Sequence, residues 1–203
     1  MISWFFLSLF AAFIGCTLSI LIFNAMEPEP VIVKVIIQDP ERMNPEEVFP
    51  EERVEPQAID REFDILQPCG YTAEELALAV SDQYRSELLP YIDSFLEAEE
   101  TYGVNAFYLL CKFGLESGWG QYMAAENNIS GWTNADGSYR DFNSVEDCIM
   151  HVSKSLSTTY REAVGSKIDD VCARYCQNDG YLDTLLGIMR DREAVIERQG
   201  QAT

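Results

Sequence analysis

Basic side chains are scarce in this sequence. It contains 14 lysines and arginines against 34 aspartates and glutamates, which gives a net charge of −20. Phosphate binding needs the opposite sign, so we exclude nucleic acid as a partner. Histidine occurs once, at His151, without the carboxylate and serine setting of a catalytic triad. The sequence therefore favours neither triad chemistry nor a histidine-rich metal site.

Paired-cysteine motifs are also missing. No C-x-x-C occurs, and five cysteines follow residue 23, an odd number that excludes a complete disulfide framework. Cys172 and Cys176 are four residues apart and could join His151 at a metal, but small buried apolar residues are the better interpretation. We expect no metal and no cofactor.

The first 23 residues, MISWFFLSLFAAFIGCTLSILIF, contain no charged side chain. As a helix rising 1.5 Å per residue they would cross a hydrocarbon layer of about 30 Å. A cleaved signal peptide is the alternative, but the basic start, short apolar core and small-residue cleavage site of such a peptide are missing. We interpret residues 1–23 as a single-pass transmembrane anchor, with the acidic remainder outside the cell membrane.

Residues 24–68 are rich in proline and glutamate, which disfavours regular helix and favours an extended stalk. Helical patterns begin after Cys69. Thr72 and Glu75 form a T-x-x-E capping arrangement, Gly103 is a stop signal, and Ser144 caps a later helix. Residues 105–119 are expected to form a helix that is apolar on nearly every side and hence largely buried. The sequence has no internal repeat, so 69–203 is expected to be one domain.

A polar segment, NNISGWTNADGSYRDF, interrupts the helices at residues 127–142. Its Asp-Gly pair between aromatic residues is the signal of a tight β-hairpin. The expected fold class is α+β, mainly α: a helical domain with a small hairpin lobe, preceded by a transmembrane helix and an extended stalk.

Glu116 ends an apolar helix and is followed at once by Ser-Gly-Trp-Gly. A weak surface salt bridge to Lys112, four residues earlier, is the structural alternative. Three features favour chemistry instead. Leu109 and Phe113 lie on the same strip of the helix as Glu116, and the last helical turn disfavours negative charge. Both effects favour the protonated form of Glu116, which a general acid requires. Trp119 and Gln121 then supply the aromatic, hydrogen-bonding edge on which a sugar ring can stack.

Three segments together resemble a known family: AEETYGVNAFYLLCKFGLESGWGQYMAAENNISGW, YRDFNSVEDCIMHV and VCARYCQNDGYLDTLLGIM. In this order they resemble the glucosaminidase domain of family 73 glycoside hydrolases, bacterial enzymes that cut peptidoglycan. The resemblance spans about residues 90–192 and implies a lysozyme-like fold. It also implies hydrolysis of the β-1,4 bond between N-acetylglucosamine and N-acetylmuramic acid, with Glu116 in the position of the catalytic glutamate.

The second catalytic group is not evident from this resemblance. Many relatives carry a threonine-glutamate motif in the hairpin lobe, and this chain does not. Asp136 and Asp141 are the carboxylates available there, although a turn former or a helix-start residue is at least as good an interpretation of each. The substrate's own acetamido oxygen could attack instead, in which case one acid suffices. Candidates for the walls and floor of a glycan groove are Trp119, Gln121, Trp132, Tyr139 and Tyr175. For the aromatic ones, a place in the core is the alternative.

The sequence thus predicts a membrane-tethered, outward-facing endo-β-N-acetylglucosaminidase whose partners are peptidoglycan glycan strands and the membrane. A muramidase or lytic transglycosylase on the same fold is one alternative. A wall-binding scaffold without catalytic activity is another.

Overall fold

The computed structural model describes residues 54–81, 86–176, 178 and 180–200, which lie in one compact unit that begins at Glu51. The predicted anchor and the predicted stalk up to residue 53 lie outside the described residues. None of the helices within the described part of the chain is both long and apolar enough to span a membrane.

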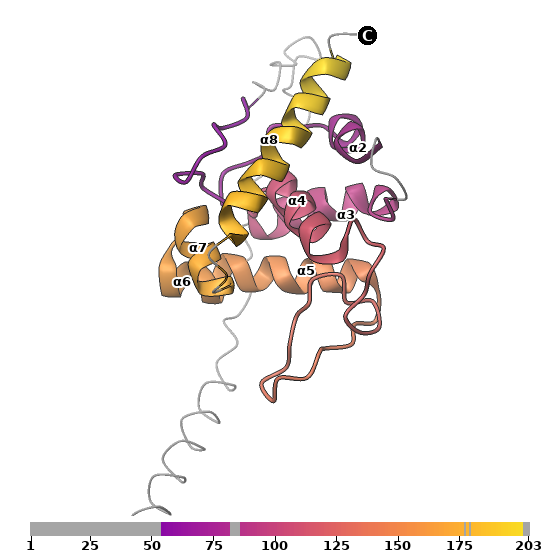
Figure 1. Cartoon of the computed structure of the whole chain (residues 1–203), viewed down its shortest axis with the longest axis vertical. Helices are drawn as coiled ribbons and strands as arrows, with labels where there is room; N and C mark the ends of the chain where they lie inside the picture. Colours follow the sequence, from indigo (N-terminus) through magenta and orange to yellow (C-terminus); the bar gives the residue numbers. More distant parts are fainter. Residues whose placement is uncertain (1–53, 82–85, 177, 179, 201–203) are drawn as a thin grey trace, which may run out of the picture. The chain divides into compact units, whose positions relative to one another are not determined.

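The described chain is mainly helical, as predicted (Figure 1). Its elements in order are α2 (Ala73–Ser81), η2 (Leu89–Tyr91), α3 (Ile92–Tyr102), α4 (Ala106–Ser117), α5 (Val145–Ser155), η3 (Leu156–Tyr160), α6 (Arg161–Val164), α7 (Ile168–Tyr175) and α8 (Tyr181–Gly200). η3 is a π-helical turn that continues directly from α5.

Helix α4 lies at the centre of the core. Every residue from Ala106 to Gly114 is buried, which confirms the prediction from its apolar sequence. α3 packs on one side of α4 and α8 on another, α2 packs on α8, and α5 packs on α3. In Figure 1, α8 crosses in front of α4 while α5 runs beneath them. The last turn of α4 is thereby held in a fixed place.

Local signals in the sequence fix several helix ends. Glu75 N–H donates to Thr72 Oγ1 at 3.2 Å while Thr72 N–H donates to Glu75 Oε2 at 2.9 Å, so the predicted capping box is confirmed. α3 stops at Gly103, whose φ is +68°, and the Ser144 side chain caps α5 by accepting from Asp147 N–H. At the start of α4 the Asn105 side chain accepts from Tyr108 N–H.

The predicted stalk was wrong in its last part. Ile59, Phe63 and Ile65 are buried in the core, at 8%, 3% and 0% exposure. Backbone bonds from Ile65 N–H to Ser166 O and from Ile168 N–H to Phe63 O tie this segment to the start of α7. The prolines of this segment do exclude helix, but an extended chain with apolar residues can still pack against a core. The folded domain therefore begins well before Cys69.

The hairpin lobe is present but short. Within the described residues it comprises one antiparallel bridge between Thr133 and Tyr139, with Asn134 N–H donating to Ser138 O at 2.8 Å. Gly137 takes a φ of +84° in the turn, the left-handed backbone that the Asp-Gly signal predicts. The sheet component is thus smaller than the α+β prediction suggests.

Candidate active site

Glu116 lies in the last turn of α4, one residue before the helix ends. Gly118 takes the left-handed conformation at φ +58°, and its N–H donates to Gly114 O. The chain then turns away sharply, because Trp119 also has a positive φ of +62°. This turn leaves the Glu116 side chain at the edge of the core, 19% exposed.

One carboxylate oxygen of Glu116 is held by two neighbours. The Tyr181 hydroxyl, at the start of α8, donates to Oε1 at 2.5 Å, and the Lys112 ammonium lies 3.5 Å from the same oxygen. The other oxygen, Oε2, faces Gly131, where an added Cβ would lie 3.9 Å away. The carboxyl group therefore has one anchored oxygen and one oxygen that faces the loop opposite.

The ion pair between Lys112 and Glu116, weighed from the sequence as the structural alternative, exists as a contact but not at the surface. The Lys112 side chain is only 1% exposed, and its ammonium lies 3.5 Å from the centre of the Tyr175 ring. Burial lowers the pKa of Lys112, but Tyr175 and Glu116 outweigh that effect and hold the net pKa above its ordinary value. Lys112 is thus a buried cation directly beneath the candidate acid.

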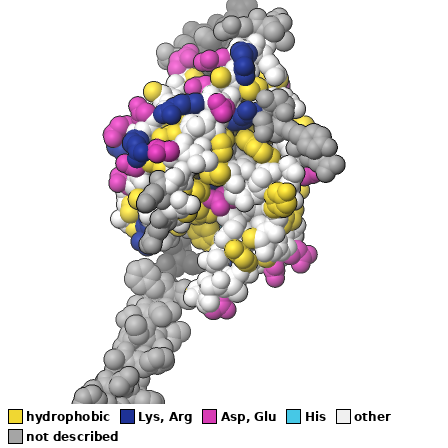
Figure 2. Space-filling model, viewed as in Figure 1, with side chains coloured by type: hydrophobic (Ala, Val, Ile, Leu, Met, Phe, Trp, Pro, Cys, Tyr) yellow, Lys and Arg dark blue, Asp and Glu magenta, His cyan; other side chains and the backbone are white. Residues whose placement is uncertain are grey.

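Glu116 opens into a cleft of about 370 Å³. α4 supplies the acid, the loop after the Asn-Asn pair supplies one wall, and η3 with the end of α7 supplies the other. The lining residues are Glu116, Gly131, Trp132, Thr133, Tyr160, Tyr175 and Cys176. The cleft is therefore an acid flanked by aromatic rings, which suits a sugar ring with apolar faces. Figure 2 shows one face of the molecule, on which hydrophobic side chains gather toward the middle and most acidic side chains lie at the margin.

Asn128 holds the loop that forms the first wall. It is fully buried, its Nδ2 donates to Trp132 O and Arg140 O, and its Oδ1 accepts from the N–H groups of Ser130 and Trp132. These four bonds shape the turn that follows α4. The backbone of Trp132 is thereby fixed at the mouth of the cleft.

Tyr175 and Tyr181 hold the other wall together. The Tyr175 hydroxyl donates to Ser130 O at 2.8 Å, and its ring centre lies 5.8 Å from that of Tyr181. Burial, reinforced by the nearby Glu116 carboxylate, raises the pKa of both phenols, although Lys112 acts against the increase at Tyr175. Both side chains therefore stay neutral hydrogen-bond donors at neutral pH.

The structure brings together Glu116, Trp132 and Tyr175 of the predicted site residues. Trp119 instead packs its ring on Gly114, where an added Cβ would lie 2.7 Å from the indole. The guanidinium carbon of Arg192 lies 5.8 Å from the centre of the same ring. Gln121 is exposed, and Tyr139 is 57% exposed on the hairpin. None of these three is among the residues that line the described cleft.

Asp136 and Asp141, the candidates for a second carboxylate, both make structural hydrogen bonds. Asp136 Oδ1 accepts from the hydroxyl and the N–H of Ser138 at the hairpin tip, and these bonds lower its pKa. Asp141 Oδ1 accepts from Glu126 N–H at 3.1 Å. Both are exposed, and neither lines the described cleft. The turn role weighed from the sequence accounts for the contacts of Asp136, whereas Asp141 bonds the loop after α4 and not the start of a helix.

Sequence reasoning missed Tyr181. It is separated from Glu116 by 65 residues, and no motif around it indicates contact with an acid. The signal in the sequence was indirect: Tyr181 lies four residues before the apolar pair Leu185–Leu186 of a late helix, and it begins an element that packs on α4. Tyr160, Thr133 and Cys176 also line the cleft without having been singled out for it.

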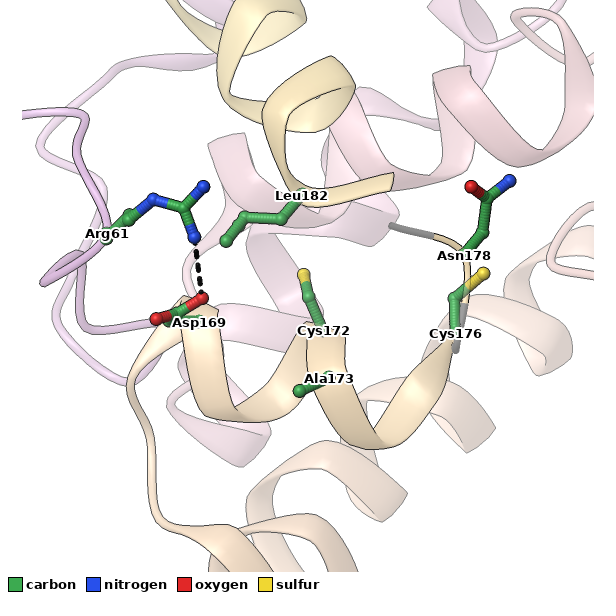
Figure 3. Close-up of a pocket in the computed structure, with 7 residues that line it drawn as sticks. All are labelled: Arg61, Asp169, Cys172, Ala173, Cys176, Asn178 and Leu182. Atoms are coloured by element: carbon green, nitrogen blue, oxygen red, sulfur yellow. Dashed lines mark hydrogen bonds and ion pairs between the residues drawn. The ribbon is translucent and has the colours of Figure 1, made fainter. Parts of the chain in front are cut away.

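A second cavity, of about 360 Å³, is also lined by Cys176. Figure 3 shows the Cys172 and Cys176 side chains projecting from the α7 region toward it, with the Arg61–Asp169 ion pair, 3.0 Å long, at the other end. Burial raises the pKa of the Cys172 thiol to about 12, which keeps it protonated. His151 lies elsewhere, with its ring 5.3 Å from that of Trp132. Over the described ranges, no group of three or more acidic, cysteine or histidine side chains is arranged to hold a metal.

Known proteins resemble this chain in both sequence and fold. Residues 92–194 match the Glucosaminidase family model, described as mannosyl-glycoprotein endo-beta-N-acetylglucosaminidase. Two Streptococcus pneumoniae proteins named as endo-beta-N-acetylglucosaminidases, from the serotype 4 strain TIGR4 and from strain R6, are each 30% identical over 138 residues. These matches cover 62% of this chain but only 21% and 20% of those proteins, so the chain spans about a fifth of their length.

Solved structures of Staphylococcus aureus autolysin E share the fold. The complex of a catalytic mutant with the disaccharide NAG-NAM has a TM-score of 0.53 at 16% identity, covering 65% of this chain and 71% of that one. The complex with the muropeptide NAM-L-Ala-D-iGlu has a TM-score of 0.56 at 18% identity, with the same coverage. The expected lysozyme-like glucosaminidase architecture is confirmed for the described domain.

Proposed function

Because the chain belongs to the glucosaminidase family, we propose that it hydrolyses the β-1,4 bond between N-acetylglucosamine and N-acetylmuramic acid in peptidoglycan, with Glu116 as general acid. One observation carries the proposal: Glu116, at the end of the buried helix α4, lines a cleft of about 370 Å³ together with three aromatic side chains, Trp132, Tyr160 and Tyr175. The NAG-NAM disaccharide bound by autolysin E supports the choice of substrate.

In the proposed reaction the protonated Glu116 donates to the glycosidic oxygen as the bond to the anomeric carbon breaks. Positive charge develops on the sugar and must be neutralised from the opposite side. Asp136 and Asp141 lie outside the residues lining the cleft, which supports attack by the substrate's own acetamido oxygen. Water then opens the resulting ring intermediate, and Glu116, now ionised, accepts a proton from that water.

The first test is Glu116→Gln in the full chain, assayed by clearing of purified cell wall. A general acid typically contributes 10²- to 10⁴-fold, so we expect at least a 100-fold loss of rate. Asp136→Asn makes the same carboxylate-to-amide change outside the cleft and should stay within about twofold of the wild type. Equal clearing by the wild type and Glu116→Gln would exclude the acid role. A large loss in Asp136→Asn would instead point to a carboxylate mechanism through the hairpin.

Analysis of the cleaved ends separates the alternatives within the fold. Hydrolysis at the anomeric carbon of N-acetylglucosamine leaves that sugar as the new reducing end. A muramidase leaves N-acetylmuramic acid there, and a transglycosylase leaves an anhydro form of it. Wall binding without any new end in either the wild type or Glu116→Gln would support the scaffold alternative.

We also propose that residues 1–23 tether the enzyme to the cell membrane and that the chain before Val54 serves as a stalk that faces the wall. The support is the uncharged 23-residue start followed by a proline- and glutamate-rich segment. Deleting residues 2–23 should move the protein from the membrane fraction to the soluble fraction. Recovery in the membrane fraction after that deletion would contradict the tether.

A further inference from the structure

Lys112 is a buried cation whose ammonium has no hydrogen-bond acceptor among the described residues. A buried charge is costly unless a partner compensates it. The compensation here comes from two groups of the cleft, the Glu116 carboxylate at 3.5 Å and the face of the Tyr175 ring, also at 3.5 Å. The Lys112 ammonium therefore contacts the candidate acid directly, and these contacts offset the free-energy cost of burying its charge.

The other titratable groups that face Glu116 are phenols and thiols. Burial raises the pKa of Tyr108 on α4, of Tyr175 and Cys172 on α7, and of Tyr181 on α8. Tyr160 and Cys176 complete the titratable lining of the cleft, and burial also raises the pKa of Cys148 on α5, which feels the Lys112 charge. Among these described neighbours of Glu116, Lys112 is the one basic side chain.

The contacts also distinguish the two oxygens of the acid. Oε1 receives the Tyr181 hydroxyl and faces the Lys112 ammonium, both of which are donors. A proton on Oε1 would point at these donors and be repelled. The proton of the neutral acid is therefore favoured on Oε2, the oxygen toward Gly131 of the cleft wall.

We propose that Lys112 is a positioning residue for Glu116: with Tyr181 it holds Oε1, directs the transferable proton to Oε2, and sets the upper pH limit of hydrolysis. This inference rests on the proposed function. When Glu116 gives up its proton, the new carboxylate stands 3.5 Å from the ammonium, so Lys112 stabilises charge that develops during bond cleavage.

The sign of the pH effect follows from this charge. An opposite charge within about 4 to 6 Å shifts a carboxyl titration by about one to three pH units toward ionisation. Lys112→Met removes the charge at similar volume, so the alkaline limb of kcat/KM should move about one to three pH units higher. The maximal rate should fall at the same time, because the developing carboxylate has lost its stabilising partner.

The experiment measures kcat/KM against pH on purified glycan strands for the wild type, Lys112→Met and Lys112→Arg in the full chain. Lys112→Arg keeps the charge and should keep the wild-type limb. Lys154→Met, an exposed lysine on α5, removes the same net charge away from the cleft and should leave the limb in place. A Lys112→Met limb within about 0.3 pH unit of the wild type would overturn the proposal, because a merely structural lysine lowers rate without moving the limb.

A second measurement does not depend on activity. The carboxyl ¹³C signal of Glu116, assigned by its loss in Glu116→Gln, should titrate at higher pH in Lys112→Met than in the wild type. If the wild type does not hydrolyse glycan, the proposed function fails while this titration still decides the role of Lys112. If circular dichroism shows that Lys112→Met does not fold, the same titration on Lys112→Gln decides it, and an unmoved signal there overturns the proposal.

Discussion

Tyr181 is the residue whose small change tests the geometry at Glu116 most directly. Removing its hydroxyl in Tyr181→Phe deletes the 2.5 Å bond to Oε1 and keeps the ring that packs on Tyr175. Hydrogen bonds to charged groups contribute about 1.5 to 3 kcal/mol, so kcat/KM should fall about 10- to 100-fold. Steady-state kinetics at the optimum pH measure the loss.

Tyr71→Phe is the matched control for that substitution. Its hydroxyl also bonds a carboxylate, Glu193 at 3.2 Å, but far from the described cleft. It should change stability slightly and leave kcat/KM within about twofold. Equal losses of activity in the two variants would show that Tyr181 acts through general stability and not through the acid.

At the level of single residues, the sequence predicted the acid but not its partners. Glu116 stands out because glycines, an apolar strip and the end of a helix all lie within a few residues of it. Tyr181 lies 65 residues away, and only packing of α8 on α4 brings it near. Lys112 was visible at the right spacing, yet spacing cannot tell a surface pair from a buried one.

At the level of elements, the loop after α4 is fixed by one side chain. Asn128→Ala would leave the carbonyls of Trp132 and Arg140 without the Nδ2 donor of a fully buried side chain. Each unsatisfied buried group costs about 1 to 3 kcal/mol, so we expect a loss of about 2 to 4 kcal/mol in the free energy of unfolding. Chemical denaturation measures it, and activity should fall as well, because Trp132 loses its fixed place at the cleft.

Asn134→Ala provides the comparison within the same lobe. Asn134 is exposed and donates to the Ser138 hydroxyl at the hairpin tip, so its loss should cost less than about 1 kcal/mol. If Asn128→Ala is no more destabilising than Asn134→Ala, the loop is not held by Asn128.

Helix ends were the most predictable elements, because caps are local. Thr72 with Glu75, Gly103 and Ser144 each act within three or four residues of sequence, and all are confirmed. The hairpin was predictable in place but not in extent, since Asp-Gly fixes a turn and says little about how far pairing continues beyond Thr133 and Tyr139. The cleft walls depended on contacts between elements, such as the bond from Tyr175 to Ser130.

On the scale of the whole molecule, the domain boundary also depends on contacts between distant segments, which the sequence pattern does not reveal. Composition placed the boundary at Cys69, because proline and glutamate mark a stalk. The partners of the preceding segment lie far along the chain: Ile65 bonds Ser166 and Asn105, and Arg190 of α8 bonds Ile59 O. A segment that contributes a few apolar residues to a distant core has no periodic pattern of its own.

This boundary predicts that a fragment of residues 69–203 is unstable, whereas residues 51–203 fold. Removing Ile59, Phe63 and Ile65 exposes the surfaces they cover, and each buried side chain of this size contributes about 1.5 to 3 kcal/mol. The sum, about 5 to 9 kcal/mol, is comparable to the total stability of about 5 to 15 kcal/mol of an ordinary domain. Thermal melting should therefore show one cooperative transition for 51–203 and none, or one at a much lower temperature, for 69–203. Matching melting temperatures would mean that the segment merely rests on the surface, and Ile59→Ala with Phe63→Ala in the full chain would then also leave stability unchanged.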